Sequence, residues 1–321
     1  MCLHIDGIPG YTADIMLKRL FRRRTEVKSI GQTMGLACSQ TSKSPQFGDP
    51  MLSAIHAHFL DTELTSVPGR CVEKHQITPA QRAKMLDWMV EVTAQFECAT
   101  QTYFLAVTVM DMFFTRYSKS LPSSELHVVG VTAMFIASKV EDVYPLRLKL
   151  VHERIANMTL SETKIKATEI AILRSLDFVA NLTTPWDFLS LYFTLFQTSS
   201  SIEKTAEIVL RLSLMFYDTL NILPSQRALS AFIVACTCSN RVGYVPQILE
   251  TLGLKEADIS KSMNLIYARV VSYPEHFKSC KSFTKFLRFQ MVLKVPGPLF
   301  VFEEEKMERE QKGLFGESAS W

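Results

Sequence analysis

A lysine at the end of a strongly apolar segment is the first residue in this chain whose chemistry needs an explanation. The run LHVVGVTAMFIASKVEDVYP, residues 126–145, is apolar around its whole circumference and then presents Lys139 followed by two carboxylates. A helix that is apolar on every side is a buried core helix. Because an unpaired buried charge is strongly unfavourable, we expect Lys139 to find acceptors. It is the first candidate functional residue.

Arg82 and Asp111 form a second charged constellation. Asp111 lies in the apolar run VTVMDMFF, where a carboxylate without a partner would be unfavourable. Arg82 begins the helix that should pack beside this run. We therefore interpret Arg82 and Asp111 as a buried structural ion pair whose loss would prevent folding.

Composition restricts the class of protein. A chain of 321 residues with 47% hydrophobic content should form roughly two domains. The net charge of +3 is too mild to indicate nucleic-acid binding. The seven cysteines show neither metal-ligand spacing nor an even disulfide framework, which favours a reduced compartment, cytoplasmic or nuclear. No signal segment or membrane span is evident, so we expect no membrane association.

The spacing of apolar residues predicts an all-α chain. A first helix is expected over residues 49–64, before Pro68-Gly69. Five more follow, at about 79–97, 101–116, 123–140, 147–156 and 161–176. After Thr184-Pro185 the pattern starts again, with helices near 186–196, 202–218, 225–239, 245–252, 255–271 and 279–289. No alternation typical of strands is sustained, and the two halves suggest a duplicated architecture.

Three segments in the first half resemble the cyclin box: MLDWMVEV at 85–92, VTVMDMFF, and VGVTAMFIASKVEDVYP. Further on, LRSLDF at 173–178 and the run at 212–232 are similar to later parts of the cyclin folds. The resemblance covers about 49–290, and SKVEDVYP is most similar to the mitotic A and B group.

The resemblance implies two tandem five-helix cyclin folds with an added N-terminal helix. Their expected bounds are 47–180, with the preceding helix, and 181–290, between flexible tails at 1–46 and 291–321. It also implies a regulatory subunit that binds a cyclin-dependent kinase and moves the kinase's helix αC and activation loop into their active positions. The chain shows no phosphate loop, kinase catalytic pattern, nucleophile elbow or zinc-type histidine pair. We therefore expect no enzyme, no cofactor and no metal.

In cyclins a lysine at the end of the third helix and a glutamate in the fifth bind the kinase. Their matches here are Lys139 and Glu169. Such a pair can present donors and acceptors to a kinase backbone. The alternative is a salt bridge that only fastens two helices. The resemblance also suggests an apolar part of this interface, formed by Ile136, Val140, Leu173 and Phe178.

A-type cyclins also carry a groove that receives Arg-x-Leu motifs of substrates and inhibitors. The matching positions are Gln81, Lys84, Met85, Trp88, Glu91 and His127. Met85, Trp88, Met89 and Val92 share one helical stripe, which would give an exposed apolar strip. Positions 81 and 84 are apolar in the family pattern, and Lys84 would repel a basic motif. The alternative is that Trp88 only packs.

The tails carry weaker signals. KRLFRRR at 18–24 could direct nuclear import, and its start is similar to the docking motif. An Arg-x-x-Leu destruction motif is not seen in the N-terminal tail, since such runs begin at Arg147 and Arg211, in expected helices. Two other functions stay open: a cyclin-fold transcription factor, and a helical scaffold that activates no kinase.

Overall fold

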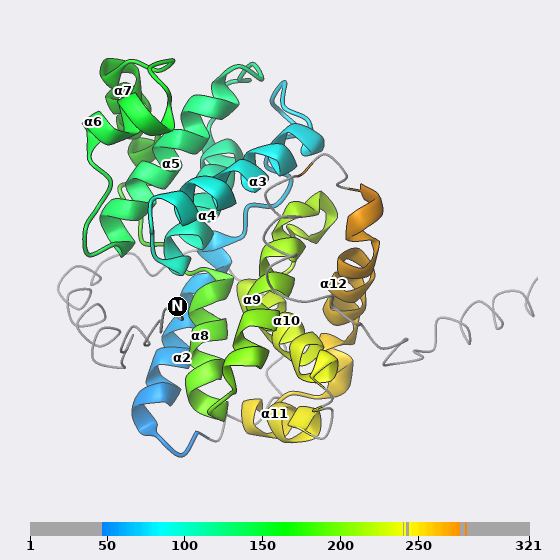
Figure 1. Ribbon diagram of the computed structural model, residues 1–321. Helices are drawn as coiled ribbons and strands as arrows, with labels where there is room; N and C mark the ends of the chain where they lie inside the picture. Colours follow the sequence, from blue (N-terminus) through cyan, green and yellow to red (C-terminus); the bar gives the residue numbers. More distant parts are fainter. Residues whose placement is uncertain (1–46, 240, 242–243, 277–279, 281–321) are drawn as a thin grey trace, which may run out of the picture. The chain divides into compact units, whose positions relative to one another are not determined.

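The computed structural model describes residues 47–239, 241, 244–276 and 280 (Figure 1). Within these residues the regular structure is entirely helical, which confirms the all-α prediction. The expected tails at 1–46 and 291–321 and the helix expected at 279–289 fall on residues outside the described ranges, apart from Cys280.

The helices form two successive groups of five, preceded by α2 (Pro50–Glu63). The first group comprises α3 (Pro79–Gln95), α4 (Thr100–Arg116), α5 (Glu125–Glu141), α6 (Leu148–Leu150) with a following π-helical segment, and α7 (Glu162–Ser175). The second comprises α8 (Pro185–Phe196), α9 (Ser200–Met215), α10 (Pro224–Cys238), α11 (Tyr244–Leu252) and α12 (Glu256–His276). Proline stands in the first turn of α2, α3, α8 and α10. Backbone N–H groups in a first turn have no acceptor within the helix, so proline, which lacks this group, costs no hydrogen bond there.

Helix α5 is the centre of the first group. It contacts α3, α4 and α7, and the side chains from Val128 to Ser138 are buried without interruption. Gly130 allows α3 to approach closely, since a Cβ at this position would stand 1.9 Å from Cε of Met85. The apolar circumference of this helix therefore reflects close packing on all sides.

Helix α10 has the same central place in the second group. It contacts α8, α9 and α12, and its small residues Ala228, Ser230, Ala231 and Ala235 are fully buried. Arg227 is also buried in this helix and donates to the carbonyl oxygens of Ser213 and Thr219. Burial lowers the pKa of Arg227 to about 9. These bonds replace the hydration that the guanidinium loses.

Three expected helices differ from the observed ones. The helix expected at 255–271 continues to His276, as α12. The helix expected at 147–156 is one α-turn followed by the π-helical segment η2, Val151–Ile155. After the right-handed Ala156, Asn157 and Met158 adopt left-handed backbone conformations. The helix expected at 202–218 stops at Met215, where Phe216 is extended. The carbonyls of this helix end are occupied by side chains, because Leu214 accepts from Arg82 and Ser213 from Arg227.

Helix α2 packs on the second group through α8 and α10. The Glu63 carboxylate accepts from the backbone N–H and the hydroxyl of Ser225, at 2.8 and 3.0 Å, in the first turn of α10. Its negative charge is favourable at that helix N-terminus. His56 is buried among aromatic rings, with centroids 5.8 Å from Phe188 and 6.2 Å from Tyr192. In the described part of the chain, no helix has the combined length and hydrophobicity of a membrane span.

Candidate functional site

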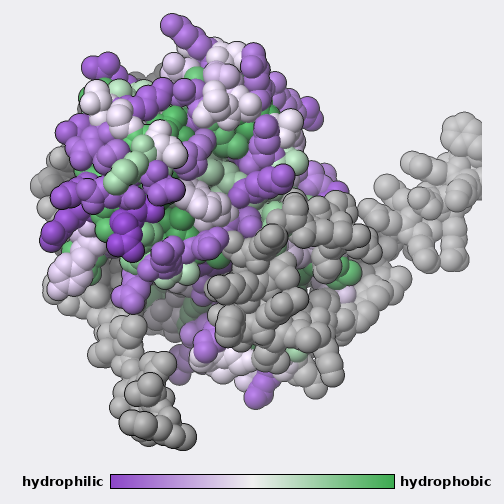
Figure 2. All heavy atoms as spheres, turned by 45° about the horizontal axis from the view of Figure 1, so that its top comes forward, coloured by the Kyte–Doolittle hydropathy of each residue, from purple (hydrophilic) through white to green (hydrophobic). Residues whose placement is uncertain are grey.

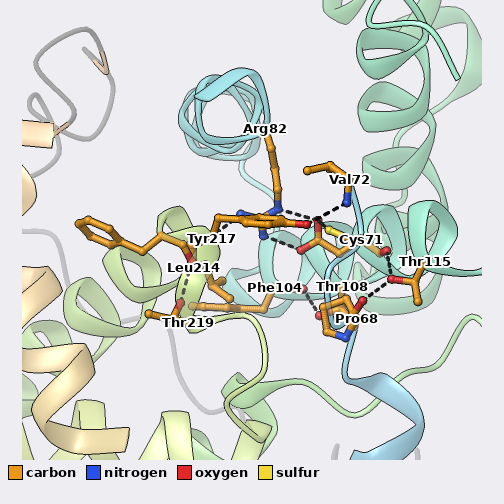
Figure 3. A network of polar contacts seen from close by, with 12 residues as sticks. Pro68, Cys71, Val72, Arg82, Phe104, Thr108, Thr115, Leu214, Tyr217 and Thr219 are labelled. Atoms are coloured by element: carbon orange, nitrogen blue, oxygen red, sulfur yellow. Dashed lines mark hydrogen bonds and ion pairs between the residues drawn. The ribbon is translucent and has the colours of Figure 1, made fainter. Parts of the chain in front are cut away.

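Arg82 lies at the centre of a buried polar network (Figure 3). Its Nε and Nη2 atoms donate to the two carboxylate oxygens of Asp111, at 2.8 and 2.5 Å. Its Nη1 atom donates to the Leu214 carbonyl oxygen at 2.8 Å. Burial acts to lower the pKa of Arg82, but the Asp111 carboxylate holds it above its ordinary value. The network joins α3, α4 and α9.

The same network fixes the segment that leads into α3 (Figure 3). The Cys71 thiol donates to Asp111 at 3.6 Å, and the Val72 N–H donates to the Tyr217 hydroxyl at 3.2 Å. The Thr115 hydroxyl donates to the Pro68 carbonyl oxygen. Because Arg82 and Asp111 present no surface, this pair can serve folding but cannot contact a partner directly.

Lys139 and Glu169 form a different kind of pair, at the surface. Lys139 stands in the last turn of α5, and its Nζ lies 2.5 Å from the carboxylate of Glu169 in α7. The side chains keep 41% and 18% of their surface exposed, so both can still receive or donate further hydrogen bonds. Nζ also lies 3.8 Å from the ring centroid of Phe135. A second pair, Lys164 with Glu125, joins the same two helices at 2.9 and 3.1 Å.

The apolar candidates around Lys139 and Glu169 differ in exposure. Ile136 is buried in the core of the first group and offers no surface to a partner, because α5 is covered on every side there. Val140 and Leu173 are half-buried. Phe178, just after α7, keeps 69% of its surface exposed.

Further exposed apolar residues accompany the pair, and the sequence interpretation did not single them out. Val143 and Tyr144, in the connection from α5 to α6, are 80% and 92% exposed. Ile170 follows Glu169, and Val179 follows Phe178; both are also exposed. Figure 2 brings the top of Figure 1 forward and shows green apolar residues lying among purple hydrophilic ones on that face. The sequence does carry one indication of the exposure of Val143 and Tyr144: they stand directly before Pro145, in a connection between two predicted helices.

Phe178 also has an unusual backbone. Its φ is +59°, and that of the preceding Asp177 is +51°. Its N–H donates to the Leu173 carbonyl oxygen at 2.7 Å, which closes the end of α7. Bulky residues rarely adopt the left-handed region, and such strain is concentrated at functional sites. The fold thus presents an exposed phenyl ring on a strained turn.

The expected exposed strip for docking motifs is not formed. Met85, Met89 and Val92 are buried, because their stripe of α3 faces the interior and Met85 fills the space beside Gly130. Trp88 remains half-exposed, with its ring centroid 5.3 Å from that of His127. Burial lowers the pKa of His127.

The remaining positions predicted for the docking groove are either exposed or used to cap α3. Lys84 and Glu91 are exposed on α3. Gln81 is occupied at the start of the helix, where its side chain accepts from the Thr78 N–H at 2.8 Å and the Thr78 side chain caps α3 in return. This use explains a polar residue at position 81 without any docking role.

The fold defines an all-α protein with two successive five-helix units tied together by a buried arginine. Two models of known protein families match consecutive parts of the chain. Residues 54–181 match the family described as "Cyclin, N-terminal domain", and residues 183–291 match "Cyclin, C-terminal domain". The chain belongs to the cyclin family.

Curated relatives include mitotic cyclins. The chain is 28% identical over 235 residues to G2/mitotic-specific cyclin-B1 of Carassius auratus, which covers 71% of this chain and 58% of that protein. It is 32% identical over 255 residues to cyclin-A2 of Xenopus laevis, covering 70% and 60%. The chain thus spans less than two thirds of the length of these relatives.

Solved structures show the same fold. A viral cyclin from herpesvirus saimiri superposes with a TM-score of 0.59 at 16% identity, covering 69% of this chain and 96% of that one. A chain of the yeast RNA Pol II CTD kinase CTDK-1 complex gives a TM-score of 0.53 at 12% identity, covering 87% and 86%. At these identities the likeness concerns the fold alone.

Proposed function

We propose that this protein is the regulatory, activating subunit of a cyclin-dependent kinase and acts in the cell cycle, in the nucleus, the cytoplasm or both. The first cyclin fold binds the kinase's helix αC and activation loop, and the chain itself carries out no catalysis. Membership of the cyclin family and similarity to mitotic cyclins support this proposal.

The observation that carries the proposal is the half-exposed pair of Lys139 and Glu169, which exposed apolar residues accompany in the sequence. An ammonium and a carboxylate held 2.5 Å apart offer donors and acceptors to a partner backbone while partly neutralising each other. We define the kinase-binding face as Lys139, Glu169, Val140, Val143, Tyr144, Ile170, Leu173, Phe178 and Val179. Its exposed apolar side chains would lose contact with water when a partner covers them.

Activation then follows from differential binding. The face fits the active arrangement of the kinase better than the inactive one and shifts the population toward it. A shift from 1:99 to 99:1 requires about 5.5 kcal/mol of differential binding. An interface of standard size, about 800 Å² on each partner, can supply this. We do not extend the proposal to docking of Arg-x-Leu motifs, since the apolar strip expected there is buried.

The test compares two double variants that each remove one salt bridge between α5 and α7. Lys139→Ala with Glu169→Ala removes the pair in the proposed face, and Glu125→Ala with Lys164→Ala removes the other. Binding of each purified variant to a cyclin-dependent kinase is measured by calorimetry, with circular dichroism as the control for folding.

We expect the variant without Lys139 and Glu169 to bind at least tenfold more weakly and the other to bind like wild type. Equal losses would show that both pairs only fasten the helices. Folded wild-type protein that binds no cyclin-dependent kinase would overturn the proposal in favour of the scaffold or transcription-factor alternative.

A further inference from the structure

The connection between α5 and α6 combines high exposure with firm attachment. Val143 and Tyr144 are the most exposed large apolar residues among those the structure describes, at 80% and 92%. Exposed apolar residues in a connection are ordinarily free to move. Here the residues on both sides of them are held by hydrogen bonds to buried parts of the first fold.

The first attachment is the side chain of Asp142. Its Oδ1 atom accepts from the Ala99 N–H at 2.8 Å and from the Thr102 hydroxyl at 2.6 Å. Ala99 is the N-cap of α4 and has the extended backbone of a cap, but its side chain can accept no hydrogen bond. A carboxylate 43 positions along the chain therefore takes part of the capping role and places its charge at a helix N-terminus.

The Cys98 thiol, just before α4, also lies close to the Asp142 carboxylate. Burial raises the pKa of Cys98 to about 12, and the negative charge of Asp142 with its hydrogen bond to the thiol adds to the increase. Asp142 is thus surrounded by donors from the start of α4.

The second attachment lies on the other side of Val143 and Tyr144. The Leu146 N–H donates to the buried Ser138 hydroxyl at 2.9 Å, and the Leu146 side chain is itself buried. The Asp142 N–H donates to the Ser138 carbonyl oxygen, also at 2.9 Å. The chain between Asp142 and Leu146 can therefore adopt few conformations.

We infer that Asp142 is a positioning residue, which holds Val143 and Tyr144 in the orientation that the kinase-binding face requires. The inference rests on the proposed function. Asp142 acts through the start of α4, and Val143 and Tyr144 make the contact. If the connection loses its anchor and adopts the binding arrangement only a tenth of the time, the apparent Kd for the kinase rises about tenfold.

The experiment separates positioning from stability by restoring the cap of α4 locally. Asp142→Ala removes the anchor, and Ala99→Ser supplies a hydroxyl at the N-cap of α4 without touching the connection. Thermal stability, kinase affinity and the NMR order parameters of the Val143 methyl groups are measured for the wild type, Asp142→Ala, the double variant, and Asp142→Asn.

Asp142→Ala should lower the melting temperature, raise the kinase Kd about tenfold and disorder the Val143 methyl groups. Adding Ala99→Ser should restore the melting temperature but neither the affinity nor the methyl order. Asp142→Asn keeps an acceptor oxygen and should behave nearly as wild type.

Recovery of affinity in the double variant would mean that Asp142 acts through stability alone and would overturn the inference. Unchanged methyl order in Asp142→Ala would overturn it as well, and this readout does not depend on any kinase. If methyl order falls as expected while wild-type protein binds no kinase, the proposed function fails and the anchoring by Asp142 stands without its kinase role.

Discussion

Phe178 allows the strain and the function of one residue to be measured separately. Its side chain is 69% exposed on the proposed kinase-binding face, and its φ of +59° is costly for any residue with a Cβ. We predict opposite rankings for two substitutions that both remove the ring. Phe178→Ala keeps the strain, whereas Phe178→Gly removes both the ring and the strain.

The magnitudes follow from the backbone. The left-handed conformation costs an L-residue about 1–2 kcal/mol. Glycine recovers this cost, but it makes the unfolded chain more flexible, which offsets about 0.4–1 kcal/mol. The difference between the central values of these two terms predicts that the glycine variant is more stable than the alanine variant by about 0.8 kcal/mol. If the ring is a central contact, both variants should lose about 2 kcal/mol of kinase binding, or roughly 30-fold in Kd.

Met158 provides a matched control. Its φ is also +59° and its side chain is also 69% exposed, but it precedes α7, whereas Phe178 follows that helix. The 14 residues of α7 separate the two positions by about 21 Å along the helix axis.

Urea unfolding and calorimetric titration with the kinase give the two quantities for all four variants. Alanine and glycine at position 158 should differ in stability as they do at 178, with no loss of kinase affinity at either substitution. Equal stability of alanine and glycine at 178 would refute the strain argument. Wild-type affinity in both Phe178 variants would refute the place of Phe178 in the interface.

Two further predictions concern buried ionisable side chains. Arg82→Ala or Asp111→Ala should each destabilise the fold by about 3–5 kcal/mol, because the remaining charge is left buried without its partner; urea denaturation measures this, and a loss below 1 kcal/mol would contradict the structural role. Burial lowers the pKa of His56 to about 4, below its unfolded value of about 6.5, so the unfolded state binds an additional proton as pH falls through this window. The free energy of unfolding of the wild type should therefore fall by about 2 kcal/mol between pH 7 and pH 5 because of His56. His56→Phe should abolish this fall, as measured by urea unfolding at both pH values. An unchanged pH dependence in the variant would contradict the lowered pKa of His56.

The spacing of apolar residues predicts the fold well, because the two central helices, α5 and α10, are visible in the sequence as apolar runs rich in small residues. The run containing Lys139 is apolar on every side, and α5 proved to be the centre of its unit. The boundary errors arose where tertiary contacts override local preference. Helix α9 ends at Met215 because Arg82 and Arg227, distant in sequence, occupy the carbonyls of its last turn, and no local pattern reveals this.

The functional face was only partly visible in the sequence. Spacing and resemblance led to Lys139 and Glu169, and the structure brings their side chains together. Residue type does not reveal exposure: Ile136, predicted from the sequence to lie in the interface, is buried, and the residue type of Tyr144 does not mark it as exposed. The anchoring of the connection by Asp142 depends on an alanine 43 positions earlier, which periodicity does not reveal.

The central claim is activation of a kinase, and the most direct test is a titration of kinase activity. A purified cyclin-dependent kinase catalytic subunit is mixed with increasing amounts of this protein, and phosphate transfer to histone is measured. We expect a saturable increase in activity that reaches its plateau at one molecule of this protein per kinase. Activity that stays at the level of the isolated kinase, with folded protein in excess, would contradict it.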